Sequence, residues 1–245
     1  IVTFDGAPND LRTEEQLGRA VNASQKGRVS ARRLDGALFV QRVASGQGES
    51  AADGSGRTLF AAQARLDNRA ELGAALAIPP PELARTPDNL LIQRMHQHWG
   101  EAGIARCLGA FAFALWDADA RRLVLGRDCL GNRALFFHRG RGFVAFATTL
   151  GALLAMPRVP RELDETTLAN FLAVNQTEPR RTFYRDIERV PTRMLVTFDP
   201  NGTSHRHYWS PDLDAPPPYR RDEDYIERAR ELFDQRPDLA GEIVL

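Results

Sequence analysis

The stretch Gly109–Asp117 decides the fold. It reads Gly-Ala-Phe-Ala-Phe-Ala-Leu-Trp-Asp, and from Gly109 onward the apolar pattern has a period of two. This period is typical of a β-strand, so a strand is predicted over Phe111–Trp116. A turn at Asp117–Ala120 and a second apolar run at Arg121–Arg127 follow, which predicts an antiparallel partner. We expect the aromatic side chains of the first strand to lie in the core of a sheet.

Further hairpins and helices surround this stretch. Turn residues separate two more pairs of strands, which are Ala134–His138 with Phe143–Thr148, and Met194–Phe198 with His205–Trp209. Helices are predicted over Leu11–Val21, from Thr86 (as N-cap) to Gly100, and from Asp164 (as N-cap) to Ala173. Hairpin-like strands beside separate helices indicate an α+β fold with antiparallel sheets.

Composition excludes several classes of protein. The chain has 245 residues, with 32 basic and 32 acidic side chains, which argues against a dedicated nucleic-acid or anionic-membrane binder. No apolar run has the roughly 18 residues that a membrane-spanning helix needs. Two cysteines, Cys107 and Cys129, make no disulfide framework and lack the spacing of metal ligands. We therefore expect a cytoplasmic protein, with no metal site, no nucleic-acid partner and no membrane partner.

The character of the chain changes after residue 210. Pro211–Arg221 contains three consecutive prolines and is predicted to be a linker. Asp222–Gln235 has the apolar stripe of an amphipathic helix. We therefore expect a first domain over residues 1–210, a linker over 211–221, and the start or remnant of a second domain over 222–245.

The central motifs resemble a known family. Gly109–Asp117 and the following Arg127–Phe137, which reads Arg-Asp-Cys-Leu-Gly-Asn-Arg-Ala-Leu-Phe-Phe, are similar to the core of the glutamine amidotransferase domain of asparagine synthetase B-like enzymes. Arg65–Leu72 is similar to the family segment N-G-E-I-Y-N-x-x-E-L, and Pro87-Asp88 precedes a similar helix. The resemblance covers about residues 60–209.

This resemblance implies a four-layer αββα sandwich of the N-terminal-nucleophile type, with two antiparallel sheets between helices. It also implies a second, ATP-using synthetase domain after the linker. The pyrophosphate-binding signature S-G-G-x-D-S of that domain does not occur in these 245 residues. ATP and Mg²⁺ are therefore expected in a missing synthetase domain, and no cofactor is expected in this chain. Its expected partner is its own C-terminal synthetase domain.

The resemblance also identifies positions for glutamine chemistry. Active family members use an N-terminal cysteine as nucleophile and its own amino group as base, whereas this chain starts with Ile1. The two oxyanion donors of the family, an asparagine side chain and the next backbone N–H, correspond to Gln63 and Ala64. The acidic contacts for the substrate amine correspond to Arg65 and Asp88.

These substitutions predict a degenerate glutamine site without catalytic residues. The amide of Gln63 is one methylene further out than that of asparagine, and Arg65 has the wrong charge for an ammonium group. Arg42 is the one candidate for the substrate carboxylate. Asp88 has an alternative interpretation as a carboxylate favoured by the dipole of its helix. We interpret Arg127 and Asp128 as a structural ion pair at a strand end.

Three hypotheses for function follow. The first is an ATP-dependent amide-bond-forming ligase with a non-glutaminase N-terminal domain. The preferred enzyme of this type is a bacterial lasso peptide macrolactam cyclase, and β-lactam synthetases are a second group of the same type. The expected partners of a cyclase are a precursor peptide and the protease or recognition protein that processes it. The second is a glutamine-hydrolysing asparagine synthetase whose cysteine precedes Ile1. The third is a non-enzymatic scaffold domain.

Overall fold

The computed structural model describes residues 1–4, 11–22, 27–43, 51–52, 56–175, 178–214, 218–219 and 221–234. The chain divides into two compact units, Ile1–Ser210 and Pro211–Leu245. The second unit contains α8 (Asp222–Asp234), all of whose residues are exposed or half-exposed. Part of the predicted linker and the last eleven residues lie outside the described residues.

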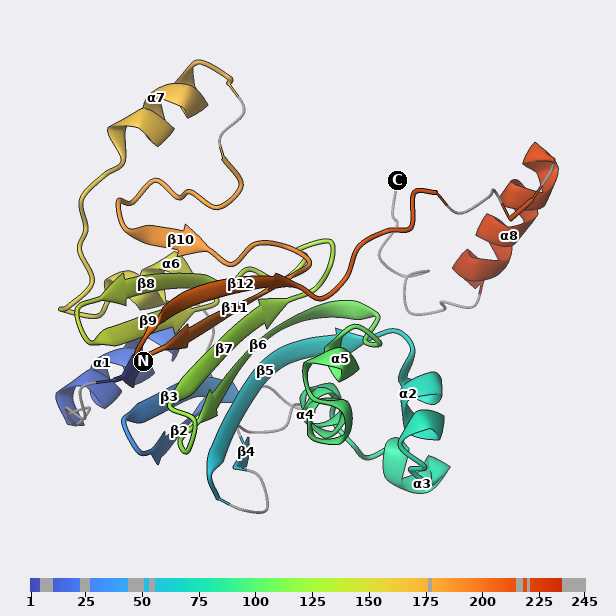
Figure 1. The fold of residues 1–245 in the computed structure, drawn as a ribbon, viewed down its shortest axis with the longest axis horizontal. Helices are drawn as coiled ribbons and strands as arrows, with labels where there is room; N and C mark the ends of the chain where they lie inside the picture. Colours follow the sequence, from blue (N-terminus) through green and yellow to red (C-terminus); the bar gives the residue numbers. More distant parts are fainter. Residues whose placement is uncertain are drawn as a thin grey trace. The chain divides into compact units, whose positions relative to one another are not determined.

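The first unit is built on two six-stranded sheets (Figure 1). The first sheet has the strand order β10-β8-β9-β1-β3-β2, and its pairings are antiparallel. Its strands are β1 (Val2–Thr3), β2 (Arg28–Leu34), β3 (Ala37–Val43), β8 (Phe136–Gly140), β9 (Phe143–Ala147) and β10 (Ile187–Arg189).

The second sheet has the order β12-β11-β7-β6-β5-β4 and is also antiparallel. Its strands are β4 (Ala51–Ala52), β5 (Thr58–Leu66), β6 (Gly109–Asp117), β7 (Arg122–Arg127), β11 (Met194–Asp199) and β12 (Gly202–His207). The predicted hairpins are confirmed, since β6 pairs with β7, β8 with β9, and β11 with β12.

Helices cover the outer faces of both sheets. Against the first sheet lie α1 (Leu11–Asn22) and α6 (Leu150–Leu154). On the side of the second sheet lie α2 (Arg69–Ala75), α3 (Pro80–Leu83), α4 (Asp88–Trp99) and α5 (Glu101–Ile104). The remaining helix of this unit, α7 (Glu165–Leu172), stands away from the sheets in Figure 1.

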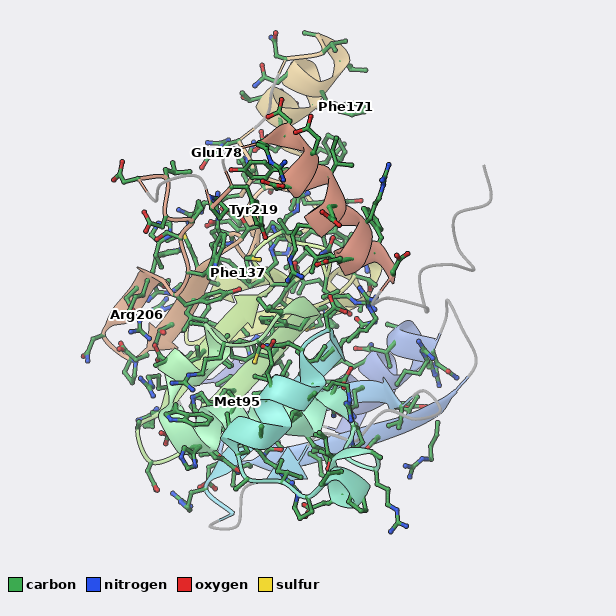
Figure 2. All side chains as sticks on the ribbon, turned by 90° about the vertical axis from the view of Figure 1, so that its right-hand side faces the viewer. Met95, Phe137, Phe171, Glu178, Arg206 and Tyr219 are labelled. Carbon is green, nitrogen blue, oxygen red and sulfur yellow. The ribbon has the colours of Figure 1, made fainter. Side chains whose placement is uncertain are left out.

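Three apolar layers hold this arrangement together. One lies between the sheets and includes Trp116 of β6 and Phe137 of β8. A second joins the second sheet to α4, where Met95 lies, and a third joins the first sheet to α1 and α6. Met95 and Phe137 are labelled in Figure 2. Helix, sheet, sheet and helix therefore alternate, and the predicted four-layer αββα sandwich is confirmed.

The strand β6 lies at the centre of the sandwich and is apolar on both faces. Its alanines and Trp116 face the first sheet, whereas Phe111, Phe113 and Leu115 face the helices. Trp116 is 1% exposed. An aromatic side chain buries roughly 150–250 Å², which at about 25 cal/mol per Å² contributes about 4–6 kcal/mol. Because both faces of β6 are covered, the residues of this strand are apolar almost without interruption.

One predicted helix boundary is wrong. The sequence favoured Thr86 as the N-cap of α4, but Pro87 occupies that position with extended backbone. The Thr86 hydroxyl instead donates to the Glu82 carbonyl oxygen at 2.9 Å and stabilises the turn after α3. By contrast, the Asp164 side chain accepts from the Thr167 N–H at 3.0 Å, as predicted for the start of α7.

No helix within the described ranges combines the length and the apolar character needed to cross a membrane. Among those same residues, His, Cys, Asp and Glu side chains form no group of three or more that could hold a metal ion.

A close approach of two backbones gives a test of the sheet register. Gly109 begins β6 with φ +142°, and a Cβ added there would lie 2.1 Å from the Arg65 carbonyl oxygen of β5. Gly109→Ala is expected to lower the free energy of unfolding by about 3 kcal/mol through backbone strain and steric overlap. Urea denaturation measures the change. Gly202→Ala, where a Cβ meets nothing within 4 Å, is the matched control and should change stability far less; equal effects would contradict the register.

Candidate functional site

A cavity of about 390 Å³ lies where residues of the two sheets and α1 face one another. We call it the inter-sheet cavity. Its apolar wall includes Ala61, Ala112 and Ala114, whose small side chains leave room in the layer between the sheets. The polar residues that line it are Gln41, Arg42, Gln63, Asn132, Arg133, Thr148 and Thr149.

The first residue of the chain also lines the inter-sheet cavity. Its amino group donates to the Leu38 carbonyl oxygen at 2.9 Å, which extends the pairing of β1 with β3. Burial lowers the pKa of this amino group from 8.0 to about 5.

Alternation along β5 separates the predicted site residues. Gln63 lies on the same face of the strand as Ala61, which packs in the layer between the sheets, and lines the inter-sheet cavity. Ala64 is on the opposite face with Ala62, against the helix side. Successive side chains of a strand point to opposite faces. Gln63 and Ala64 therefore face different surroundings.

Ala64 and Asp88 line a second hollow of about 450 Å³, together with Arg69 and Thr86. We call it the Arg69 hollow. The Asp88 carboxylate at the start of α4 accepts from the Leu66 N–H at 2.8 Å and forms an ion pair with Arg69. The Arg69 guanidinium also donates to the carbonyl oxygens of Leu83 at 2.6 Å and Thr86 at 2.8 Å. Asp88 thus connects β5, α2 and α4.

Arg65 belongs to neither hollow. Its side chain is 44% exposed and forms an ion pair with Asp67 at 3.3 Å. The four predicted positions are therefore distributed over three places: Gln63 on the inter-sheet cavity, Ala64 and Asp88 on the Arg69 hollow, and Arg65 at the surface.

The sequence matches a known family of domains. Residues 51–209, more than half of the chain, match the model of a family described as a glutamine amidotransferase domain. The chain belongs to this glutamine amidotransferase family.

Curated relatives of the amidotransferase domain include asparagine synthetases. The chain is 25% identical over 146 residues to asparagine synthetase [glutamine-hydrolyzing] 3 of Bacillus subtilis. These aligned residues make up 59% of this chain and 24% of that protein. It is 32% identical over 98 residues to a putative asparagine synthetase [glutamine-hydrolyzing] of Mycobacterium tuberculosis H37Rv, and these residues make up 39% of this chain and 15% of that protein. The chain spans about a quarter or less of the length of these relatives, so the comparison identifies an asparagine synthetase-like domain.

Solved structures resemble the domain more distantly. A glutamine aminotransferase class-II domain protein from Silicibacter pomeroyi is 12% identical, with a TM-score of 0.42, over 71% of this chain and 74% of that chain. The glutamine phosphoribosylpyrophosphate amidotransferase of B. subtilis is 12% identical, with a TM-score of 0.39, over 62% of this chain and 29% of that chain.

The side chains around the inter-sheet cavity limit the chemistry available to the amidotransferase domain. Its described lining residues include no cysteine, serine, histidine or carboxylate. Hydroxyl groups come from Thr148 and Thr149, and the Thr149 hydroxyl accepts from the Ala152 N–H as the N-cap of α6. Acyl transfer needs an activated nucleophile, and each well-placed oxyanion donor contributes about 3 kcal/mol. Of these groups the described lining supplies the side-chain amides of Gln41, Gln63 and Asn132.

Two arginines of these hollows were not predicted from the sequence to be site residues. Arg133 lines the inter-sheet cavity, and Arg69 neutralises Asp88. Both occur inside the motifs that carry the family resemblance, Arg127–Phe137 and Arg65–Leu72. The motifs were the available signal, but the direction of each side chain depends on the fold. Arg42, in contrast, was a candidate and does line the cavity.

The predicted ion pair between Arg127 and Asp128 is wrong. The fully buried Asp128 carboxylate accepts from three backbone N–H groups, those of Phe111 at 3.3 Å, Asn132 at 2.9 Å and Arg133 at 3.0 Å. It therefore fixes the turn between β7 and β8, where Gly131 has the left-handed φ of +76°. Burial, with the nearby charge of Arg189, lowers the pKa of Arg127.

Neither cysteine lines the inter-sheet cavity or the Arg69 hollow. Cys107 is buried in the layer beside α4, and burial raises the pKa of its thiol to about 12. A thiol with such a pKa is protonated at neutral pH and is a poor nucleophile.

The Arg69–Asp88 pair gives a test of what Asp88 does. If the carboxylate is structural, Asp88→Asn should lower the free energy of unfolding by about 1–3 kcal/mol, because Arg69 loses its ionic partner in a partly buried site. Arg69→Met and the double variant complete a mutant cycle, with an expected coupling of about 1 kcal/mol. Urea denaturation measures all four proteins. Additive effects, with Asp88→Asn as stable as the parent, would instead indicate a carboxylate kept for a ligand.

Proposed function

We propose that this chain is the N-terminal domain of an ATP-dependent amide-bond-forming ligase, and that the domain does not itself hydrolyse glutamine. The observation that carries the second part is the lining of the inter-sheet cavity. Its described side chains contain two arginines and no thiol, imidazole or carboxylate. A glutaminase needs an anion for the substrate ammonium group, and the described lining has none.

The ion pair of Asp88 with Arg69 supports the same proposal. In the family this aspartate position contacts the amine of glutamine, but here a guanidinium occupies the carboxylate. An ammonium group would have to displace Arg69 from Asp88 and from two backbone carbonyl oxygens. Arg65, at the other acidic position, supplies no carboxylate for that group and lies at the surface in an ion pair with Asp67.

The ligase part of the proposal is supported by the curated relatives, several of which are asparagine synthetases that extend far beyond the matched region. Ligases of this type activate a carboxylate with ATP, and an amine then attacks the adenylate. Without ammonia from glutamine, the amine must come from the substrate itself. A macrolactam-forming cyclase, which joins an acidic side chain of a peptide to the peptide's own amino terminus, is the form we propose.

The residues of this chain do not fit an ATP site, because the pyrophosphate-binding signature is absent from the sequence. The proposal therefore assigns ATP and Mg²⁺ to residues outside these 245, and it assigns this domain a supporting role. Helix α7 offers a surface for such a role. Three of its apolar side chains, Leu168, Phe171 and Leu172, are between 37% and 73% exposed. Phe171 is labelled in Figure 2.

One observation favours a second candidate function. Ile1 lines the inter-sheet cavity, so a residue joined to its amino group would begin at the cavity wall. A cysteine at that point would supply the missing nucleophile and would make the protein a glutamine-hydrolysing asparagine synthetase. The charges of Arg42 and Arg133, which line the cavity, would still oppose the substrate ammonium group.

The test uses the full-length protein that contains this chain. Release of glutamate from L-glutamine is measured beside a glutamine-hydrolysing asparagine synthetase, and pyrophosphate release from ATP is measured with peptides that carry an acidic side chain and a free amino terminus. We expect glutamate release at least a hundredfold below that of the reference enzyme, and pyrophosphate release that requires the peptide and does not respond to glutamine.

Two results would contradict the proposal. Glutamate release at a rate near that of the reference enzyme would establish a glutaminase. Pyrophosphate release with aspartate and glutamine, together with formation of asparagine, would establish the second candidate. N-terminal acetylation of the peptide is the matched control, because it removes the attacking amine and leaves the carboxylate intact. A cyclase should release no ring product from the acetylated peptide.

A further inference from the structure

We propose that the inter-sheet cavity binds a small organic acid, a ligand with carboxylate groups and no ammonium group. This inference names the ligand class of the cavity described above and rests on the proposal that the domain does not process glutamine. It follows from the charge around the cavity, from polar groups that lack partners, and from the small apolar side chains of the cavity wall.

The charge around the inter-sheet cavity is positive. Arg42 of β3 and Arg133, in the turn between β7 and β8, both line it. Among the described lining residues there is no aspartate or glutamate. A carboxylate is attracted to such a surface, whereas an ammonium group is repelled.

The Nε–H group of Arg133 lacks a hydrogen-bond partner. The Nε atom is buried and donates to no acceptor among the described residues. The nearest carboxylate along the chain, that of Asp128, is already engaged by three backbone N–H groups, including the N–H of Arg133 itself. The Arg133 side chain is half-buried, and a buried N–H donor without an acceptor is unfavourable. A bound carboxylate would offset this cost and could form two parallel hydrogen bonds with the guanidinium.

Neutral polar groups accompany the two arginines. The side-chain amide of Gln63 lines the inter-sheet cavity and makes no hydrogen bond with a described residue, and Thr148 adds a hydroxyl. These groups can donate to further carboxylate oxygens. The rest of the wall includes Ala61, Ala112 and Ala114, which offer apolar contact to a short methylene chain. An apolar wall with a few convergent polar groups is typical of sites for small molecules.

The charge arrangement discriminates between related ligands of similar size. Glutarate, with five carbons and two carboxylates, matches two cationic side chains and an apolar wall. Its neutral diamide, glutaramide, has the same length without charge. L-Glutamine has one carboxylate, one amide and an ammonium group that would face the arginines.

The test is isothermal titration of the 245-residue chain with glutarate, glutaramide and L-glutamine. We expect glutarate to bind at least tenfold more tightly than either of the others, and salt to weaken its binding. Arg133→Gln should weaken glutarate binding at least tenfold, and Arg133→Lys should weaken it less. Arg141→Gln, in the exposed turn between β8 and β9, removes the same charge away from the cavity and should leave the affinity unchanged.

Unfolding does not explain the expected loss in Arg133→Gln, because removal of a buried Nε–H group that lacks an acceptor should leave the melting temperature unchanged or raise it. A lower melting temperature, with glutarate affinity retained, would instead give Arg133 a structural role and overturn the inference. Equal affinities for glutarate and glutaramide, or no saturation by glutarate up to 10 mM, would overturn it too. Glutamate release from glutamine would refute the proposed function whatever the glutarate affinity, so the two failures are distinguishable.

Discussion

The contact between the two sheets is the constraint on which the rest of the domain depends. Both sheets present apolar side chains to a single layer, and Phe137 of the first sheet meets Phe198 of the second in an edge-to-face contact at 5.1 Å. Burial of aromatic side chains dominates such layers. Every strand that contributes to this layer also has an opposite face, which must be covered by helices. The four-layer order follows from that requirement.

The same layer determines where a site can form. Large side chains such as Trp116 fill it over β6, whereas Ala61, Ala112 and Ala114 leave the inter-sheet cavity unfilled. Ile1, just before β1, and the turn after β7 reach this cavity, and the Asp128 carboxylate holds that turn through its three backbone hydrogen bonds. The layer between the sheets thus sets the position of the cavity, and Arg42 and Arg133 supply its charge.

Much of the fold could be predicted from the sequence, because period-two apolar stretches such as Gly109–Asp117 carry the strand signal directly. The start of α4 was predicted imperfectly, since Thr86 forms a hydrogen bond back to α3 that only the chain path reveals. At the site, the family motifs indicated the positions Gln63, Ala64, Arg65 and Asp88. They did not reveal that alternation along β5 separates the first two, because that depends on which face each sheet turns to its partner.

The central claim is that the inter-sheet cavity suits an anion, because its described lining has two arginines and no carboxylate. The most direct measurement is a crystal structure of the chain soaked with glutarate and, separately, with L-glutamine. The account predicts electron density for a glutarate carboxylate at the Arg133 guanidinium inside the inter-sheet cavity, and no glutamine there. Glutamine ordered in the cavity, with its ammonium group on a carboxylate of the domain, would contradict it.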